Sequence, residues 1–408
     1  MENTGENMIN MGKRPLELYI HVPFCAKKCL YCDFLSFRAL ASVHEAYIGQ
    51  LIREIEAQGK WCGGYEVKTV FIGGGTPSVI DPHLIRQVMD ALKENFSISD
   101  QAEITIEVNP GTLLQNKLPV YRKAGINRVS IGLQSADNTE LRNLGRIHTF
   151  EEFLKSYQCA RMSGFSNINV DLMSSIPGQT LESWRNTLKK VTMLKPEHIS
   201  AYSLIVEEGT PFWDRYGGGA LCGKEAKESY PPLPDEDTEN RIYHFTRTFL
   251  KEQGYQRYEI SNYAKAGREC LHNLGYWRGT PYLGLGLGSS SYIGEMRFSN
   301  VRSLDAYLDL DFMAEDRGAA ALKELRGPIE ELSRQSQMEE FMFLGLRTIR
   351  GVSEIDFMSR FGVKIDGIYG PVLERLTKNG LIRREGVWIS LTEWGMDVSN
   401  FVLSEFLN

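Results

Sequence analysis

The stretch that decides the fold runs from Tyr19 to Cys32 and reads YIHVPFCAKKCLYC. It overlaps an apolar, β-rich run from Leu16 to Val22 and ends in three cysteines, Cys25, Cys29 and Cys32. Thiolates are the usual protein ligands of iron–sulfur clusters. Because these cysteines are spaced by four and then three residues, they can fold around one corner of a cubane. The stretch therefore predicts a strand followed by a cluster-binding loop.

Two alternatives to a cluster remain open from the residues alone. Zinc usually takes four Cys or His ligands, and no fourth ligand follows within the loop, while His21 and His44 are badly spaced. A chance grouping of buried thiols is the second alternative. Lys27 and Lys28 favour the cluster, because nearby cations stabilise thiolates. Three ligands would leave one iron open to a small molecule.

Composition narrows the class of protein. The chain has 408 residues, 42% of them hydrophobic, and a net charge of -6, which argues against a nucleic-acid partner. It has no apolar run of about 20 residues and no signal-peptide pattern near its start, so we expect a cytoplasmic protein. The seven cysteines do not predict disulfides in that compartment. We expect the other four to be buried small side chains.

The first half of the chain alternates strand-like and helix-like patterns. Six strands are expected at 16–22, 67–72, 103–108, 128–133, 168–173 and 198–204. Helices are expected between them, at 43–58, 83–94, shortly after Val120, at 150–163 and at 181–194. Such alternation predicts parallel βαβ units, closed as a partial (β/α)6 TIM-like barrel or left as an open sheet. Ligands of these α/β folds sit beyond the carboxyl ends of the strands.

The second half predicts a different organisation. Residues 1–15 form a tail, 16–206 the barrel, 207–237 a linker rich in Gly, Pro and acids, 238–334 a flanking region, and 335–408 a small domain. The flanking region is irregular and aromatic at 259–291. In the last part, two helices precede a hairpin around Gly386, with Pro371 expected at the start of the second helix. This order predicts a winged-helix-like α+β domain.

Polar residues and glycines follow the expected strands. Gly73, Gly74, Gly75 and Thr76 follow the second strand, and this turn predicts either a tight loop or a ligand-binding loop. Further polar candidates stand at or after the third, fourth and fifth strands: Glu107, Gln134, Arg146 and Asp171. Each alone could be a surface or capping residue, but together they predict one polar rim. The glycines at 284, 286 and 288 do not form a dinucleotide-binding pattern.

The stretch from Tyr19 to Cys32 resembles the radical S-adenosylmethionine (SAM) superfamily. More narrowly, the chain from about Leu16 onward is similar to the oxygen-independent coproporphyrinogen oxidases and their HemW-type heme-chaperone relatives. The resemblance implies a radical SAM partial barrel. It also implies a [4Fe-4S] cluster on the three cysteines and SAM at the open iron. The residues that match the family's SAM contacts are Tyr19, Tyr31, Gly74, Gly75, Thr76, Glu107, Gln134, Arg146 and Asp171.

Two features of the sequence distinguish the oxidases from the heme chaperones. The oxidases carry a further Cys two places after the third, where this chain has Phe34, and they have a longer extension before the first strand. The segment from His272 to Trp277 reads HNLGYW, which matches the HNxxYW motif of the heme chaperones. Neutral imidazole is a common heme ligand, so the match makes His272 a candidate for binding heme. A core histidine capping an irregular loop is the alternative.

The resemblance therefore predicts a heme chaperone that passes heme to acceptor proteins, including membrane-associated respiratory ones, with a homodimer as an oligomeric state to test. The other prediction is a radical SAM enzyme of porphyrin biosynthesis. In such an enzyme, an electron from the cluster cleaves SAM to methionine and a 5′-deoxyadenosyl radical that abstracts hydrogen from coproporphyrinogen III. Whether this chain is an enzyme stays open at this point.

Overall fold

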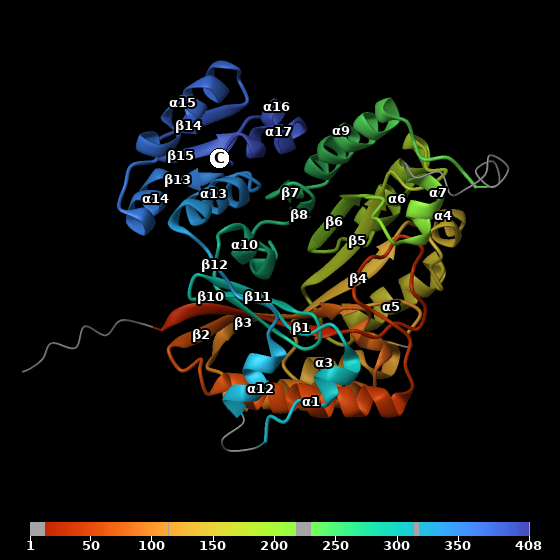
Figure 1. Ribbon diagram of the computed structural model, residues 1–408. Helices are drawn as coiled ribbons and strands as arrows, with labels where there is room; N and C mark the ends of the chain where they lie inside the picture. Colours follow the sequence, from red (N-terminus) through yellow and green to blue (C-terminus); the bar gives the residue numbers. More distant parts are fainter. Residues whose placement is uncertain (1–12, 113, 218–229, 314–317, 408) are drawn as a thin grey trace, which may run out of the picture.

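The computed structural model describes residues 13–112, 114–217, 230–313 and 318–407 (Figure 1). Six parallel strands lie side by side in chain order. They are β1 (Arg14–Val22), β2 (Tyr65–Gly74), β3 (Ile98–Val108), β4 (Arg128–Gln134), β5 (Ile168–Ser174) and β6 (His198–Ser203). This arrangement confirms the predicted α/β fold class.

Helices connect successive strands of this sheet. They are α1 (Ala41–Gly59), α2 (Pro82–Asn95), α3 (Leu118–Lys123), α4 (Asn138–Asn143), α5 (Phe150–Met162) and α6 (Leu181–Met193), with short 3-10 turns at Pro77–Val79 and Leu114–Asn116. The local sequence determines where several of these helices begin. Thr149 and Thr180 each accept from the backbone three residues on and complete a capping box. Asp81 accepts from the His83 amide at 2.7 Å and precedes Pro82.

The barrel is open, because β1 and β6 do not pair with each other. On the side away from β2, β1 pairs with β9 (Tyr282–Leu285). The sheet then continues with β10 (Ser290–Ile293), β11 (Met296–Ser299) and β12 (Glu330–Glu331). At the other edge, β8 (Asn262–Ala264) pairs antiparallel with β6, and β7 (Gln256–Arg257) follows. The segment 259–291, for which the sequence predicts an irregular structure, thus contains short strands that extend the edges of the barrel.

Further helices lie outside the barrel. They are α7 (Pro211–Tyr216), α9 (Glu236–Glu252), α10 (Leu271–Trp277), α11 (Leu304–Leu308) and α12 (Gly318–Leu325). Helix α7 lies within the segment expected to be a linker, where Thr210 caps it and Pro211 starts it. The rest of that expectation falls partly on 218–229, outside the described residues. No helix in the described part of the chain has the length and apolar character needed to cross a bilayer.

The C-terminal part has its own hydrophobic cluster, built from residues between Met338 and Phe406. Its elements are α13 (Arg334–Gly345), β13 (Val352–Ser353), α14 (Glu354–Phe361), α15 (Ile365–Lys378), β14 (Ile382–Glu385), β15 (Trp388–Leu391), α16 (Glu393–Asp397) and α17 (Ser399–Ser404). The sheet order is β13-β15-β14, and the helix and strand order is that of a winged helix. Figure 1 shows this part on the side of the molecule away from α1.

One expectation in this part is wrong. Pro371 lies inside α15 and does not start it, because the helix begins at Ile365. A proline at this place removes the bond to the carbonyl of residue 367. A Cβ at Gly367 or Gly370 would meet open space, so packing does not require glycine at either position.

Candidate functional site

The three cysteines lie in a loop after the carboxyl end of β1. The loop is closed at its base, because the Cys25 amide donates to the Phe37 carbonyl at 3.0 Å and the Phe37 amide donates to Pro23 at 2.9 Å. The ring of Phe24 is fully buried and packs edge-on against Phe37. This base anchors a loop whose three thiols remain partly exposed.

Two side chains from other parts of the barrel reach the sulfurs. The Thr76 hydroxyl lies 3.5 Å from the Cys25 sulfur, and Arg146 donates from Nη1 to the Cys29 sulfur at 3.5 Å. Arg146 also donates to the Gly132 carbonyl at 2.6 Å, and its buried Nε has no partner among the described residues. The buried guanidinium would offset the negative charge of a cluster bound by these cysteines.

The thiols are not arranged around a single metal ion. Within the described ranges, no three His, Cys, Asp or Glu side chains are grouped closely enough to hold one. A tetrahedral zinc ion, with Zn–S bonds of about 2.3 Å, needs its sulfurs close together. The choice between a cluster and zinc at these cysteines stays a prediction.

The glycine turn after β2 is required mainly by packing within the protein. A Cβ at Gly75 would lie 2.6 Å from the Phe24 carbonyl oxygen, and one at Gly74 would lie 2.5 Å from the His21 ring. Gly74 also has a positive φ of 110°, and its amide donates to a carboxylate oxygen of Glu107 at 3.2 Å. Packing thus accounts for the tightness of the turn, and Gly74 also lines the cavity described next, while ligand binding by the turn stays a prediction.

A cavity of about 240 Å³ lies inside the barrel. Four of the predicted SAM residues line it: Tyr19, Gly74, Glu107 and Asp171. The other five, Tyr31, Gly75, Thr76, Gln134 and Arg146, are not among its lining residues. Thr76 and Arg146 contact the cysteine sulfurs instead. Gln134 and Arg146 both lie beside Gly132, since a Cβ there would be 3.1 and 3.2 Å from their side chains. Tyr31 packs against Phe212, with ring centroids 6.3 Å apart.

Buried charges shape this cavity. Burial, reinforced by the neighbouring Asp171, raises the pKa of Glu107 to about 8. Asp171 accepts from the Ser130 hydroxyl at 2.7 Å and from the Asn169 amide at 2.7 Å. A bound ammonium group would offset the burial of Glu107, and the oriented Asp171 carboxylate can accept from hydroxyls. The lining thus suits a ligand that carries a cation and hydroxyl groups.

The sequence predictions for SAM do not include the other residues that line this cavity. They are Phe34, Phe71, Arg128, Ser130, Asn169, Ser200, Tyr202 and Asn273. A signal was present, because polar residues alternate along the strands that lead inward. Arg128 and Ser130 alternate in β4, as do Asn169 and Asp171 in β5, and the two strands pair across the sheet. Polar side chains at every second position of barrel strands point to a polar interior.

Helix α10, which carries the HNLGYW segment, packs into the barrel near β2. The His272 ring is 1% exposed, and its nitrogens lie 2.7 Å from the Thr69 hydroxyl and 2.9 Å from the Tyr276 hydroxyl. Burial lowers the pKa of His272 to about 3. In this conformation both ring nitrogens are hydrogen-bonded, so neither is free to bind an iron atom. This is the arrangement that the core-histidine alternative describes. Binding of heme by His272 itself stays a prediction and would require those hydrogen bonds to break.

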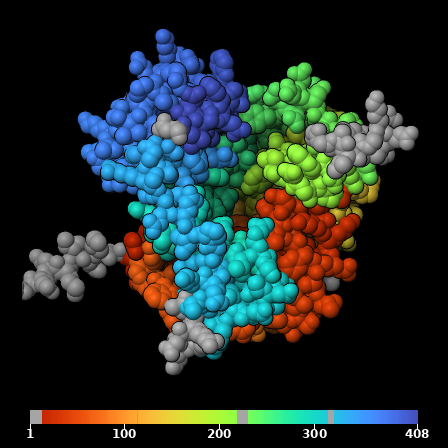
Figure 2. Space-filling view, in the orientation of Figure 1, coloured from red at the N-terminus to blue at the C-terminus, as the bar shows by residue number. Residues whose placement is uncertain are grey.

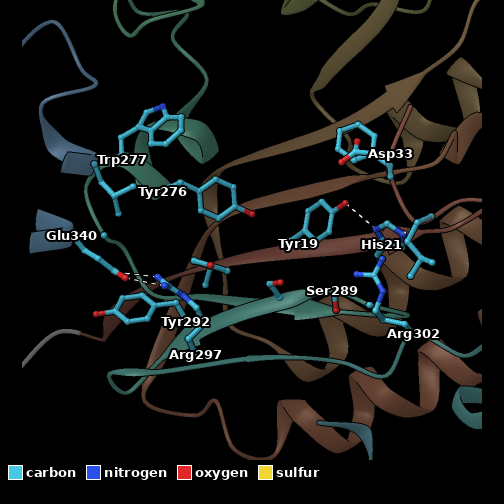
Figure 3. Close-up of a pocket in the computed structure, with 17 residues that line it drawn as sticks. Tyr19, His21, Asp33, Tyr276, Trp277, Ser289, Tyr292, Arg297, Arg302 and Glu340 are labelled. Atoms are coloured by element: carbon cyan, nitrogen blue, oxygen red, sulfur yellow. Dashed lines mark hydrogen bonds and ion pairs between the residues drawn. The ribbon is translucent and has the colours of Figure 1, made fainter. Parts of the chain in front are cut away.

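The next residues of α10 reach a second, outer cavity of about 530 Å³ (Figure 3). Tyr276 and Trp277 line it together with Tyr282 and Tyr292, and Arg347 lies 4.6 Å above the Trp277 ring. Figure 2 shows a hollow on this face between the blue C-terminal part and the red N-terminal loop. Tyr19 and Phe34 line both cavities, so the outer cavity adjoins the barrel interior.

Comparison with known proteins supports these features. The Radical SAM superfamily matches residues 19–191, which implies a [4Fe-4S] cluster and SAM as cofactors, and the HemN C-terminal domain matches residues 332–398. The chain is 36% identical to the heme chaperone HemW of Bacillus subtilis, covering 95% of this chain and 98% of that protein. It is 33% identical to the heme chaperone HemW of Escherichia coli, covering 96% and 98%.

A solved structure extends the likeness. The fold is similar to that of coproporphyrinogen III oxidase (HemN) from Escherichia coli, a radical SAM enzyme, with a TM-score of 0.80 and 25% identity. The match covers 97% of this chain and 90% of that one, so it includes the barrel and the C-terminal part. The near-complete coverage by relatives above 30% identity shows that this chain belongs to the HemW heme-chaperone family of the radical SAM superfamily.

Proposed function

We propose that this protein binds heme in the outer cavity and passes it to heme-acceptor proteins, including membrane-associated respiratory ones. The observation that carries the proposal is the aromatic wall formed by Tyr276 and Trp277, which belong to the HNxxYW segment. Flat aromatic side chains pack well against a porphyrin face. The naming of the similar proteins as heme chaperones supports the same function.

In this proposal Cys25, Cys29 and Cys32 would hold the [4Fe-4S] cluster, which when bound and reduced would supply the electron for SAM cleavage. Arg146 would bind the SAM carboxylate, Glu107 the amino group and Asp171 the ribose hydroxyls, since their charges match these groups. Tyr19 and Phe34 would transmit SAM binding to heme, because both side chains line both cavities.

Anaerobic reconstitution tests the proposal. The full chain is loaded with iron and sulfide, then titrated with SAM and with heme, and followed by EPR and optical spectra. We expect a cluster signal that SAM perturbs and the uptake of heme in a fixed ratio to protein. A cluster that forms without any heme uptake would contradict the chaperone function. Size-exclusion chromatography of the same samples tests whether SAM or heme causes dimerisation.

The likeness to the oxidase structure favours one further candidate, an oxygen-independent coproporphyrinogen III oxidase. Phe34 stands against it, because the oxidases have a cysteine at that place, and here the ring is 63% exposed over the site. Product analysis with coproporphyrinogen III, SAM and a reductant separates the two functions. Turnover to protoporphyrinogen would establish an enzyme, while SAM cleavage without that product is compatible with the chaperone.

A further inference from the structure

The outer cavity has two arginines that differ in how their charge is compensated. Arg297 donates two parallel hydrogen bonds to Glu340, at 2.8 and 3.0 Å. Arg302 has no carboxylate within ion-pair distance in the described part of the chain. Figure 3 shows the Arg297–Glu340 pair at one end of the cavity and Arg302 beside His21 and Ser289 at the other. One end of the cavity therefore carries an arginine paired with a carboxylate, and the other carries a guanidinium with no ion-pair partner among the described residues.

The backbone beside Arg302 is held by a buried network. The Asn300 amide group donates to Glu54 and to the Gly286 carbonyl, each at 2.9 Å. The Val301 amide donates to the Leu325 carbonyl at 2.8 Å, and its carbonyl accepts from Gly288 at 2.9 Å. The backbone next to the exposed Arg302 is therefore fixed, so only its side chain has to be ordered when it binds a ligand.

Gly288 lets the Leu35 side chain approach the backbone at the end of the cavity where Arg302 lies. It has a positive φ of 65°, and a Cβ there would lie 2.5 Å from Leu35 and 3.7 Å from Arg302. Gly286 likewise lets the Tyr47 hydroxyl approach, since a Cβ at this position would overlap that oxygen. The glycines at this place thus shape the end of the cavity where Arg302 lies.

The neighbours of Arg302 leave its charge uncompensated. The His21 nitrogens lie 3.0 Å from the Tyr19 hydroxyl and 2.9 Å from the Leu35 carbonyl, so the ring is already engaged. Burial, and to a smaller extent Arg302 itself, lower the pKa of His21, which keeps the imidazole neutral. Asp33 is the carboxylate on this side of the cavity, and in Figure 3 it lies across His21 from Arg302, with no bond between them.

We propose that Arg302 binds a propionate carboxylate of the tetrapyrrole and makes the cavity select the free acid over its esters. The proposal rests on heme binding in this cavity. Heme has two apolar faces, which suit the ring walls at Tyr276 and Trp277, and carboxylates along one edge. A guanidinium matches a carboxylate through two parallel N–H···O bonds. Arg297 is less suited to bind the propionate, because its guanidinium already donates two hydrogen bonds to Glu340.

Paired titrations test this assignment. The cluster-loaded protein is titrated anaerobically with heme and with heme dimethyl ester, following the Soret band and tryptophan fluorescence. Arg302→Gln and Arg302→Lys are compared with Arg86→Gln, which removes the same charge from an exposed position of α2 outside the cavity. Iron content and thermal melting check that each variant folds.

We expect the unaltered protein and Arg86→Gln to prefer heme over the ester by on the order of tenfold. Arg302→Gln loses this preference by binding heme more weakly, with its affinity for the ester unchanged, and Arg302→Lys keeps part of it. Equal affinity of the unaltered protein for acid and ester overturns the assignment alone. An unchanged preference in Arg302→Gln also overturns it. Binding of neither porphyrin by the unaltered protein overturns the proposed heme function and this inference with it.

Discussion

The Nε2 atom of His272 lies 2.9 Å from the hydroxyl of Tyr276, one turn later on the same helix. The histidine faces the barrel and the tyrosine lines the outer cavity. The HNxxYW segment thus has two faces. Asn273 reaches the inner cavity, and Tyr276 and Trp277 reach the outer one. This geometry gives His272 a way to influence heme binding without touching iron, by fixing the tyrosine.

Replacement of His272 distinguishes these two roles. We expect His272→Ala to lower the free energy of unfolding by about 3 kcal/mol, because it leaves a cavity and two buried hydroxyls unpaired. Tyr276→Phe keeps the ring wall and should cost about 1 kcal/mol. Heme titrations then compare the optical spectra. A changed spectrum in His272→Ala alone indicates iron ligation, whereas a weaker affinity with the same spectrum in both variants indicates positioning.

Gly275 tests the fit of α10 into the barrel. A Cβ at this position would overlap the Glu17 carboxylate. We therefore expect Gly275→Ala to destabilise the protein by about 3 kcal/mol or more and to weaken heme binding. Gly367→Ala is the matched control in a helix with open space, and it should stabilise by about 0.5–1 kcal/mol. Denaturant unfolding measures both, and equal effects would refute the packing argument.

Glu17 makes stability depend on pH. Burial raises its pKa from 4.5 to about 9, and its Oε2 atom has no partner among the described residues. Because the folded pKa is the higher one, folding favours the protonated carboxyl. The contribution of Glu17 to stability is complete below about pH 4.5 and is lost as the pH rises towards 9.

Glu17→Gln removes this titration while keeping the shape of the side chain. We expect the variant to be more stable than the unaltered protein by about 2–4 kcal/mol at pH 8 and equal to it near pH 5. Urea unfolding at several pH values measures the difference. A difference that stays constant from pH 5 to pH 8 would contradict the assignment of a raised pKa.

Replacement of the loop cysteines tests the cluster assignment. We expect Cys25→Ser, Cys29→Ser or Cys32→Ser to lower the bound iron and acid-labile sulfide well below the four of each per chain that a complete cluster holds. Cys159→Ser, at a partly exposed helix position away from the loop, should bind both normally. Zinc bound in place of iron by the unaltered chain under anaerobic conditions would contradict the assignment.

The six parallel strands and the loop that carries Cys25, Cys29 and Cys32 could be predicted from the amino-acid sequence alone. Strand periodicity is a local property, and cysteines that follow one another within eight residues are necessarily close in space. The helix starts at Thr149 and Thr180 are also local, because a capping box joins residues only three apart.

The roles of the other residues emerged from the three-dimensional packing. The outer cavity joins Tyr19, Tyr276 and Arg302, which are far apart in the chain and meet because β9 pairs with β1. The sequence leaves His272 either as a heme ligand or as a core histidine, and only the packing of α10 into the barrel shows that its ring lies against Thr69. Burial and long-range pairing depend on how the elements pack together, and no spacing along the chain encodes that packing.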